Sequence, residues 1–263
     1  MTRNKIPDKR TAVYKAKAII RELAIEEPSH IIIEDLAFTR GAIVKEDRIR
    51  GADGRLAVFE GMGLITVRAD IPEHGRKRFV MAHELGHYEL HREALPLISC
   101  SEDDFLKWNA DNQHLEVEAN HFAGELLMPE DMFKKKVTGK ALSAGLLESL
   151  YKTFSVSLTA AAIRFVTVRP EYALICSASD RIKWFVVDRD WFPLHLNVSG
   201  KVHTESMAYE YFQGNALPQD FCIVDPIAWT DWRVRGKLKE LSIPLGKYDH
   251  VLSFLFVEEG WDD

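Results

Sequence analysis

The chain has 263 residues, of which 46% are hydrophobic and 28% charged, and its formal net charge is −6. The length favours one large domain or two ordinary ones, and neither an apolar run that could span a membrane nor an apolar secretion signal is present in the sequence. The acidic balance argues against broad, non-specific binding to nucleic acid, which needs a basic surface.

The first part of the chain carries the signals of two helices and a small sheet. Apolar residues at helical spacing predict a helix over 11–26, which Pro28 ends, and a shorter helix over 32–40. Segments rich in β-branched residues follow at 42–48, 55–60 and 64–70, with glycine-containing turns between them. They predict three strands that form a meander.

Helices dominate the middle of the chain, and strands dominate its end. Helices are predicted over 76–91 and 114–128, with a polar loop containing some helix over 99–113 between them. Two shorter helices are predicted over 139–169. Beyond Arg169-Pro170 the composition turns β-rich and aromatic, with a hairpin over 172–187 and a buried strand over 251–257. The fold class is therefore α+β, with domain boundaries near residues 140 and 169.

The helix over 76–91 carries the pattern H-E-x-x-H in His83-Glu84-Leu85-Gly86-His87. Residues four apart lie on one helix face, so His83 and His87 aim two imidazoles at one point, as a zinc ion requires. Glu84 lies at the rim of that face, where a general base can reach water without binding the metal. The small Gly86 allows another backbone to approach closely.

A third protein ligand is expected from the helix over 114–128, because a catalytic zinc ion takes three protein ligands and keeps one open position. Glu116 is the preferred candidate, since Asn120 follows four residues later and could hydrogen-bond a ligand histidine. Glu118 is the alternative. His91 lies roughly 12 Å along the helix from His83, at 1.5 Å per residue, and is expected to support the site or the fold rather than bind the same ion.

The three cysteines are too few and too widely spaced for a disulfide framework, so a reduced, cytoplasmic protein is expected. Cys100 precedes the helix over 114–128, and a thiolate binds zinc strongly. Two interpretations stay open for it. It is an ordinary buried thiol, or it is an inhibitory ligand that fills the open position of the metal.

Residues 83–91 (HELGHYELH) and 116–129 (EVEANHFAGELLMP) resemble the ImmA/IrrE metallopeptidase family. The resemblance implies a zincin-like core over 1–140, with the E-x-x-A-D/N segment of gluzincins supporting Glu116. It also implies a helix-turn-helix-like segment over 141–169 and, less distinctly, a GAF-like sensor domain over 170–263.

The resemblance further implies a Zn²⁺-dependent endopeptidase that cleaves a helix-turn-helix (XRE-type) repressor and so derepresses stress, DNA-damage or phage-defence genes. Direct DNA binding and membrane association are not expected, and the C-terminal part could sense a ligand or mediate a homodimer. The strand Leu64 to Ala69 is the expected edge for substrate addition, and Tyr88 or His91 could stabilise the oxyanion. The alternative is a non-catalytic transcription regulator that keeps zinc only for its structure.

Overall fold

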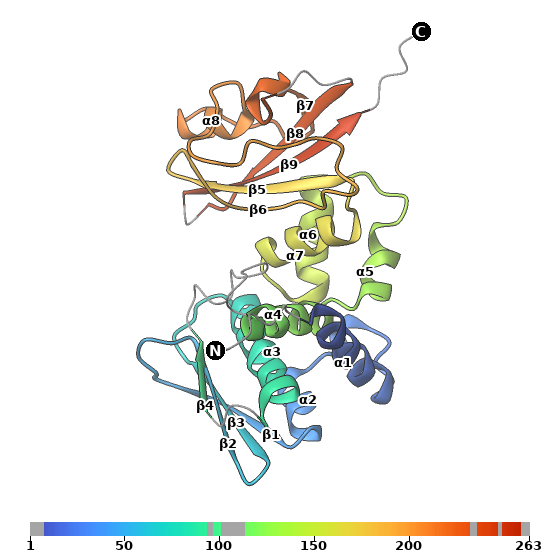
Figure 1. Ribbon diagram of the computed structural model, residues 1–263, viewed down its shortest axis with the longest axis vertical. Coiled ribbons are helices and arrows are strands. Elements are labelled where there is room, and N and C mark those ends of the chain that lie inside the picture. The colour runs from blue at the N-terminus through green and yellow to red at the C-terminus, as the bar shows by residue number, and fades with distance from the viewer. Residues whose placement is uncertain (1–7, 94–96, 101–113, 232–235, 247–248, 259–263) are drawn as a thin grey trace, which may run out of the picture. The chain divides into compact units, whose positions relative to one another are not determined.

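A computed structural model describes residues 8–93, 97–100, 114–231, 236–246 and 249–258 (Figure 1). The chain forms two compact units. The first comprises Met1–Lys136 with Tyr151–Ser157, and the second comprises Val137–Leu150 with Leu158–Asp263. The α+β class predicted from the sequence is confirmed, because helices and sheets occupy largely separate stretches of the chain. The three-part division at residues 140 and 169 stays a prediction.

The sheet of the first unit contains four strands in the order β1-β3-β2-β4. Their bounds are β1 Ala42–Asp47, β2 Gly54–Phe59, β3 Met62–Arg68 and β4 Leu97–Cys100. The predicted meander is wrong, because β1 pairs with β3 in parallel while β2 pairs antiparallel with both β3 and β4.

The reason lies in the turn between β2 and β3. Glu60 and Gly61 both have positive φ, which suits a tight hairpin and pairs β2 with β3. The segment 48–53 carries the chain past β3 rather than reversing it beside β1. Consequently β3 is a central strand and not the edge that the sequence suggested, and β2 is open to a fourth strand that lies far away in the sequence.

Within the described residues of the first unit, six helical segments accompany the sheet. They are α1 Lys9–Glu22, η1 Pro28–His30, α2 Ile33–Thr39, α3 His74–His91, α4 His114–Leu127 and α5 Glu130–Val137. Helix α5 lies between the helices predicted over 114–128 and 139–169 and is not among the predicted elements. Proline is equally compatible with the first turn of a helix, and Phe133 N donates to Pro129 O at 2.9 Å.

Close packing of α3 on α4 depends on Gly86. A Cβ added there would meet Phe122 Cδ1 at 3.0 Å and the backbone of Ala119 at 3.3 Å. The expectation that Gly86 allows a second backbone to approach is therefore confirmed. The buried face of α3 is thereby held against the helix that carries Glu116.

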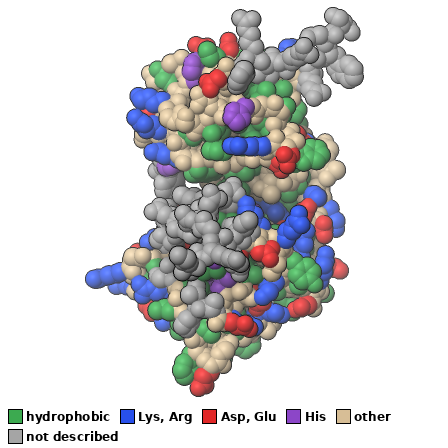
Figure 2. All heavy atoms as spheres, viewed as in Figure 1, with side chains coloured by type: hydrophobic (Ala, Val, Ile, Leu, Met, Phe, Trp, Pro, Cys, Tyr) green, Lys and Arg blue, Asp and Glu red, His purple; other side chains and the backbone are tan. Residues whose placement is uncertain are grey.

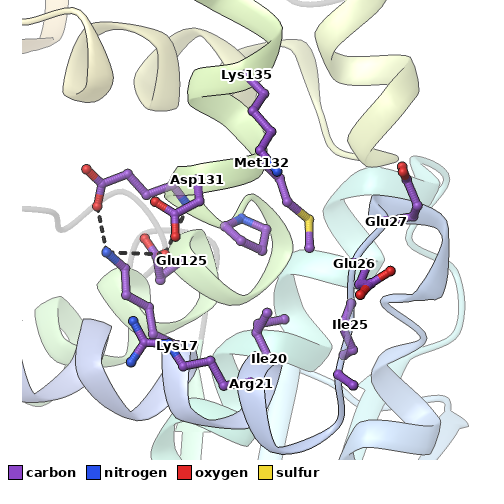
Figure 3. A pocket seen from close by; sticks show the side chains of 13 residues that line it. Lys17, Ile20, Arg21, Ile25, Glu26, Glu27, Glu125, Asp131, Met132 and Lys135 are labelled. Carbon is purple, nitrogen blue, oxygen red and sulfur yellow. Dashed lines mark hydrogen bonds and ion pairs between the residues drawn. The ribbon is translucent and has the colours of Figure 1, made fainter.

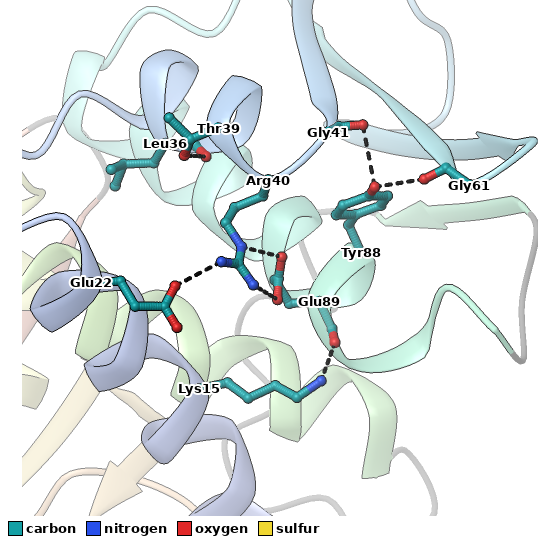
Figure 4. A network of polar contacts seen from close by, with 9 residues as sticks. All are labelled: Lys15, Glu22, Leu36, Thr39, Arg40, Gly41, Gly61, Tyr88 and Glu89. Carbon is teal, nitrogen blue, oxygen red and sulfur yellow. Dashed lines mark hydrogen bonds and ion pairs between the residues drawn. The ribbon is translucent and has the colours of Figure 1, made fainter.

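Polar contacts fix the other end of α3 (Figure 4). Arg40 follows α2 and donates to Glu89 Oε1 at 3.0 Å and to Glu22 Oε2 of α1 at 2.8 Å. Lys15 of α1 also donates to the carbonyl of Glu89. These contacts tie α1 and the end of α2 to α3, and so limit how far the motif helix can move.

The second unit is built on an antiparallel sheet with the strand order β6-β5-β9-β8-β7. The strands are β5 Tyr172–Ala178, β6 Arg181–Val186, β7 Cys222–Ile223, β8 Lys237–Pro244 and β9 His250–Glu258. The helical segments are α6 Ala144–Phe154, which ends within the first unit, α7 Leu158–Val168, α8 Met207–Phe212 and η3 Pro226–Ala228. The hairpin and the buried strand predicted for this region are both present.

The surface carries no dominant charge of one sign on the face seen in Figure 2, where acidic and basic side chains of the described residues are interspersed. Across the described part of the chain, no helix is both long and apolar enough to cross a bilayer. The predicted loop over 99–113 lies outside the described residues, except that residues 99 and 100 belong to β4.

Candidate metal centre

Four metal-binding side chains from three elements converge in the first unit. His83 and His87 lie one turn apart on α3, Glu116 comes from α4, and Cys100 ends β4. Their donor atoms all lie within 4.8 Å of one another. Both histidines and Cys100 are fully buried, whereas the side chain of Glu116 retains 18% exposure.

The distances from Glu116 and Cys100 to the histidine nitrogens are close to those around a single tetrahedral ion, whereas the two nitrogens lie closer together than such an ion would hold them. The two Nε2 atoms of His83 and His87 are 2.9 Å apart, and Glu116 Oε2 lies 3.2 and 3.4 Å from them. Cys100 Sγ is 3.5 Å from His87 Nε2. Zinc bonds of 2.0–2.3 Å in tetrahedral geometry place neighbouring ligand atoms about 3.3–3.6 Å apart. Imidazole, thiolate and carboxylate are also the donors that zinc prefers.

The two carboxylates left open by the sequence take different positions. Glu116 reaches the histidine pair, whereas Glu118 Oε2 contacts His91 Nε2 at 2.9 Å. Burial raises the pKa of Glu116, but hydrogen bonds from His83 and His87, together with their charge, outweigh it and hold the pKa below its ordinary 4.5. Glu116 is therefore anionic at neutral pH, which suits a metal ligand.

Each histidine of the motif is also held at its second nitrogen. His83 Nδ1 lies 2.9 Å from Asn120 Oδ1, in the arrangement expected for Asn120, and His87 Nδ1 lies 2.9 Å from His91 Nδ1. Both Nε2 atoms are thereby directed at the centre of the cluster. Holding the outer nitrogen fixes the ring orientation and the tautomer of a ligand histidine.

Glu84 is fully buried and its carboxylate lies against the start of β2. A Cβ added at Gly54 would meet Glu84 Oε1 at 2.3 Å and Val80 Cγ1 at 2.8 Å. Gly54 therefore makes the room that Glu84 occupies beside the cluster. The sequence places Gly54 in a turn; a glycine that begins a strand is the signal that could have indicated this close approach.

The neighbouring Asp53, also not singled out from the sequence, holds the strands around the cluster. It is 2% exposed and forms ion pairs with Arg68 at 2.9 Å and Arg76 at 2.5 Å. Its backbone N–H donates to the carbonyl of Cys100 at 2.8 Å. The same segment thus secures the end of β4 that presents the thiol.

Tyr88 does not approach the candidate reaction centre as the sequence suggested for an oxyanion donor. Its hydroxyl lies 2.7 Å from the carbonyl of Gly61 and 3.2 Å from that of Gly41, and the side chain is buried (Figure 4). These hydrogen bonds connect α3 to the backbone beside β1 and β3. The expectation for Tyr88 is therefore wrong, because its hydroxyl is engaged by backbone carbonyls of the sheet region.

A separate pocket of about 490 Å³ lies beside α1 and α5 (Figure 3). Its lining includes Lys17 and Arg21 together with Glu125 and Asp131, and Lys17 pairs with Glu130 at 2.7 Å. None of the four clustered donors lines it. The opposed charges already neutralise one another, so this pocket gives no comparable indication of chemistry.

Residues 44–166 match the Peptidase_M78 family, described as the IrrE N-terminal-like domain. This segment belongs to an IrrE-like, peptidase-type domain. All the residues proposed for the site lie within the matched segment, so the ImmA/IrrE resemblance of the sequence is confirmed for this part of the chain. The GAF-like assignment of residues 170–263 stays a prediction.

The fold of the chain is similar to that of a solved structure described as a Mycobacterium tuberculosis transcriptional regulator. The two share 13% sequence identity with a TM-score of 0.55, over 96% of this chain and 77% of the other. At that identity the likeness concerns the fold alone. A search of curated proteins found no match.

Proposed function

We propose that the protein is a regulatory zinc metalloendopeptidase whose substrate is a small helix-turn-helix (XRE-type) repressor. The observation that carries the proposal is the convergence of His83, His87 and Glu116 on one point inside a peptidase-type domain, with Glu84 beside them. In this proposal the three converging side chains hold Zn²⁺, and Asn120 orients His83.

The chain's own residues supply proton transfer and positioning. A bound zinc ion would supply Lewis-acid activation of water and of the scissile carbonyl. Glu84 accepts the proton of the attacking water and returns it to the leaving amine. Gly54 leaves the space that this carboxylate needs, and burial of Glu84 keeps bulk water from competing with its transfer.

Cys100 serves in this proposal as an inhibitory ligand. Its thiol is fully buried and lies 3.5 Å from His87 Nε2, so a thiolate there can occupy the fourth position of the metal. The enzyme would then be latent until Cys100 is withdrawn. A complete set of four protein donors is also what a purely structural zinc site contains. The presence of four donors therefore also supports the alternative of a non-catalytic regulator. The inhibitory and the structural role of Cys100 are distinguished by experiment.

The substrate strand is proposed to add at β2. Strand β4 occupies this edge, and its pairing runs from Ala57↔Leu97 to Gly54↔Cys100. Withdrawal of β4 would free both the fourth metal position and the edge of β2 beside Glu84. An extended peptide can add to such an edge through its backbone hydrogen bonds.

The biological role follows from the substrate class. Cleavage of the repressor would derepress stress, DNA-damage or phage-defence genes, in the manner of the family that the sequence resembles. The β-rich second unit is proposed to sense the activating signal as a GAF-like domain or to mediate a homodimer. Direct DNA binding is not part of the proposal, since the chain carries a net charge of −6.

The proposal is tested by co-expression with a small helix-turn-helix protein encoded beside this gene. Wild type is expected to cleave that protein, and Glu84→Gln is expected to lose about 100- to 10,000-fold in rate while it still binds zinc. A repressor left intact by wild type under inducing conditions contradicts the protease.

The role of Cys100 is tested by Cys100→Ser with and without an inducing signal. A latch predicts retained zinc and higher basal cleavage. A structural site predicts that the variant loses zinc and that neither protein cleaves. The measurements are zinc content after dialysis and the rate of repressor cleavage, with Cys176→Ser in the second unit as the matched cysteine control.

A further inference from the structure

The two candidate histidine ligands are supported differently at their outer nitrogens. His83 contacts one neutral amide, Asn120. His87 contacts a second histidine, His91, which in turn contacts the carboxylate of Glu118 at 2.9 Å. We propose that Glu118, acting through His91, is a positioning residue that fixes the tautomer and raises the ligand strength of His87. The inference rests on the proposed metal site.

The proton positions along this chain follow from one requirement. A histidine that binds a metal through Nε2 carries its proton on Nδ1. His87 Nδ1–H therefore donates to His91 Nδ1, which must accept. The remaining proton of neutral His91 then lies on Nε2 and is donated to Glu118 Oε2. A single order of donors and acceptors satisfies all three groups.

The far end of the relay is anchored to another element. Glu118 Oε1 accepts the backbone N–H of Asp8 at 2.8 Å, and Asp8 caps the N-terminus of α1. This bond leaves Oε2 directed at His91. The relay of Glu118, His91 and His87 thus joins α1, α4 and α3 within one polar network.

Burial makes the relay effective. His91 is 5% exposed, Glu118 is 7% exposed and His87 is fully buried, so bulk water has little access to replace any of the contacts. In such surroundings a terminal carboxylate polarises the bonds before it. The expected consequence is a more basic Nε2 on His87, and hence tighter zinc binding.

The test measures zinc affinity by competition with a chelator, using zinc alone as the probe. Glu118→Gln keeps the shape and the acceptor oxygen but removes the charge, and is expected to weaken binding about tenfold. His91→Phe keeps a ring but breaks the relay, and is expected to weaken binding by up to about 100-fold. Glu125→Gln is the matched control, because Glu125 is a buried carboxylate of the same helix with partners away from the cluster. Its zinc affinity should equal that of wild type.

A double-mutant cycle separates a relay from two independent structural effects. If Glu118 acts through His91, Glu118→Gln has no further effect on zinc affinity in the His91→Phe background. Additive losses overturn the relay. Thermal unfolding of each metal-free variant identifies any variant that fails to fold. If His91→Phe does not fold, the zinc affinity of Glu118→Gln, which changes only the charge, tests the relay.

Histidine ¹⁵N spectra of the zinc-loaded protein give a second readout that a packing role would not produce. Wild type should show His87 protonated on Nδ1 and His91 on Nε2, and removal of the charge in Glu118→Gln should shift the His91 Nε2 resonance while this order of protons is kept. His91 protonated on Nδ1 in wild type contradicts the inference. If wild type binds zinc and the variants bind it equally, only the relay fails. If wild type binds no zinc, the proposed metallopeptidase function is contradicted as well as the relay.

Discussion

Two largely enclosed carboxylates, Glu116 and Glu240, have opposite surroundings in the two units. In the first, Glu116 faces two imidazoles and a thiol whose donor atoms converge on one point. In the second, Glu240 of β8 is 1% exposed and accepts hydrogen bonds from four donors. These are the Trp229 indole N–H, the Met207 and Ala208 backbone N–H groups, and the Ser242 hydroxyl.

The difference separates a site for chemistry from a structural polar network. Every partner of Glu240 donates a hydrogen to it, so both carboxylate oxygens are satisfied without any further group. The imidazoles and the thiol around Glu116 can give up a proton and present lone pairs to a cation. Burial raises the pKa of Glu240, and its hydrogen bonds only partly offset that, whereas the pKa of Glu116 lies below its ordinary value.

The largest expected effect comes from removing a converging donor. His87→Ala should weaken zinc binding by more than about 100-fold, because a direct ligand contributes more than an outer partner. The measurement is chelator competition, with the exposed His195→Ala of the second unit as control. Equal affinity in both variants would show that the cluster is not the metal site and would remove the contrast with Glu240.

Next in size is a steric change that leaves every donor in place. Gly54→Ala should lower the cleavage rate about 100-fold, because the new Cβ displaces the Glu84 carboxylate and misplaced catalytic groups lose rate at this scale. Zinc affinity should stay close to that of wild type. A variant that cleaves at the wild-type rate would show that Glu84 does not act from this position.

Glu240→Gln should lower the free energy of unfolding by about 2 kcal/mol, since its amide cannot accept at both ends from the four donors. The raised pKa gives the wild type a stability contribution that is present below pH 4.5 and is lost as the pH rises through the raised value. This dependence of the free energy of unfolding on pH should be absent from the Glu240→Gln variant. Scanning calorimetry across this range tests it, and unchanged zinc binding is expected.

The smallest effect is expected at the partly exposed Glu130. Hydrogen bonds from Lys134 and Lys17 lower its pKa to about 2. The stabilising contribution of Glu130 to the free energy of unfolding is therefore present above pH 4.5 and declines as the pH falls toward 2. Glu130→Gln should cost less than about 1 kcal/mol in urea unfolding, because a solvated ion pair is screened. A larger loss of stability that does not change with salt concentration would show that the ion pairs of Glu130 behave like the buried network around Glu240.

Local patterns predicted a large part of the candidate site. The four-residue spacing of His83 and His87 and the helix carrying Glu116 and Asn120 are features of single helices, which the 3.6-residue repeat makes readable. The same holds for most of the helices and strands. Gly54 and Asp53 were not predicted as parts of the site, because a turn pattern says nothing about which distant side chain will lie against it.

By itself the sequence determined the α+β class, the motif helix and the set of residue types that can bind a metal. The tertiary structure alone decided which of them meet. It pairs β1 with β3 in parallel, brings Cys100 to the cluster along β4, and assigns Glu116 to the histidine pair and Glu118 to His91. The physical reason is that helix faces follow from local spacing. Strand order and helix crossings depend instead on burial and hydrogen bonding between segments far apart in the chain.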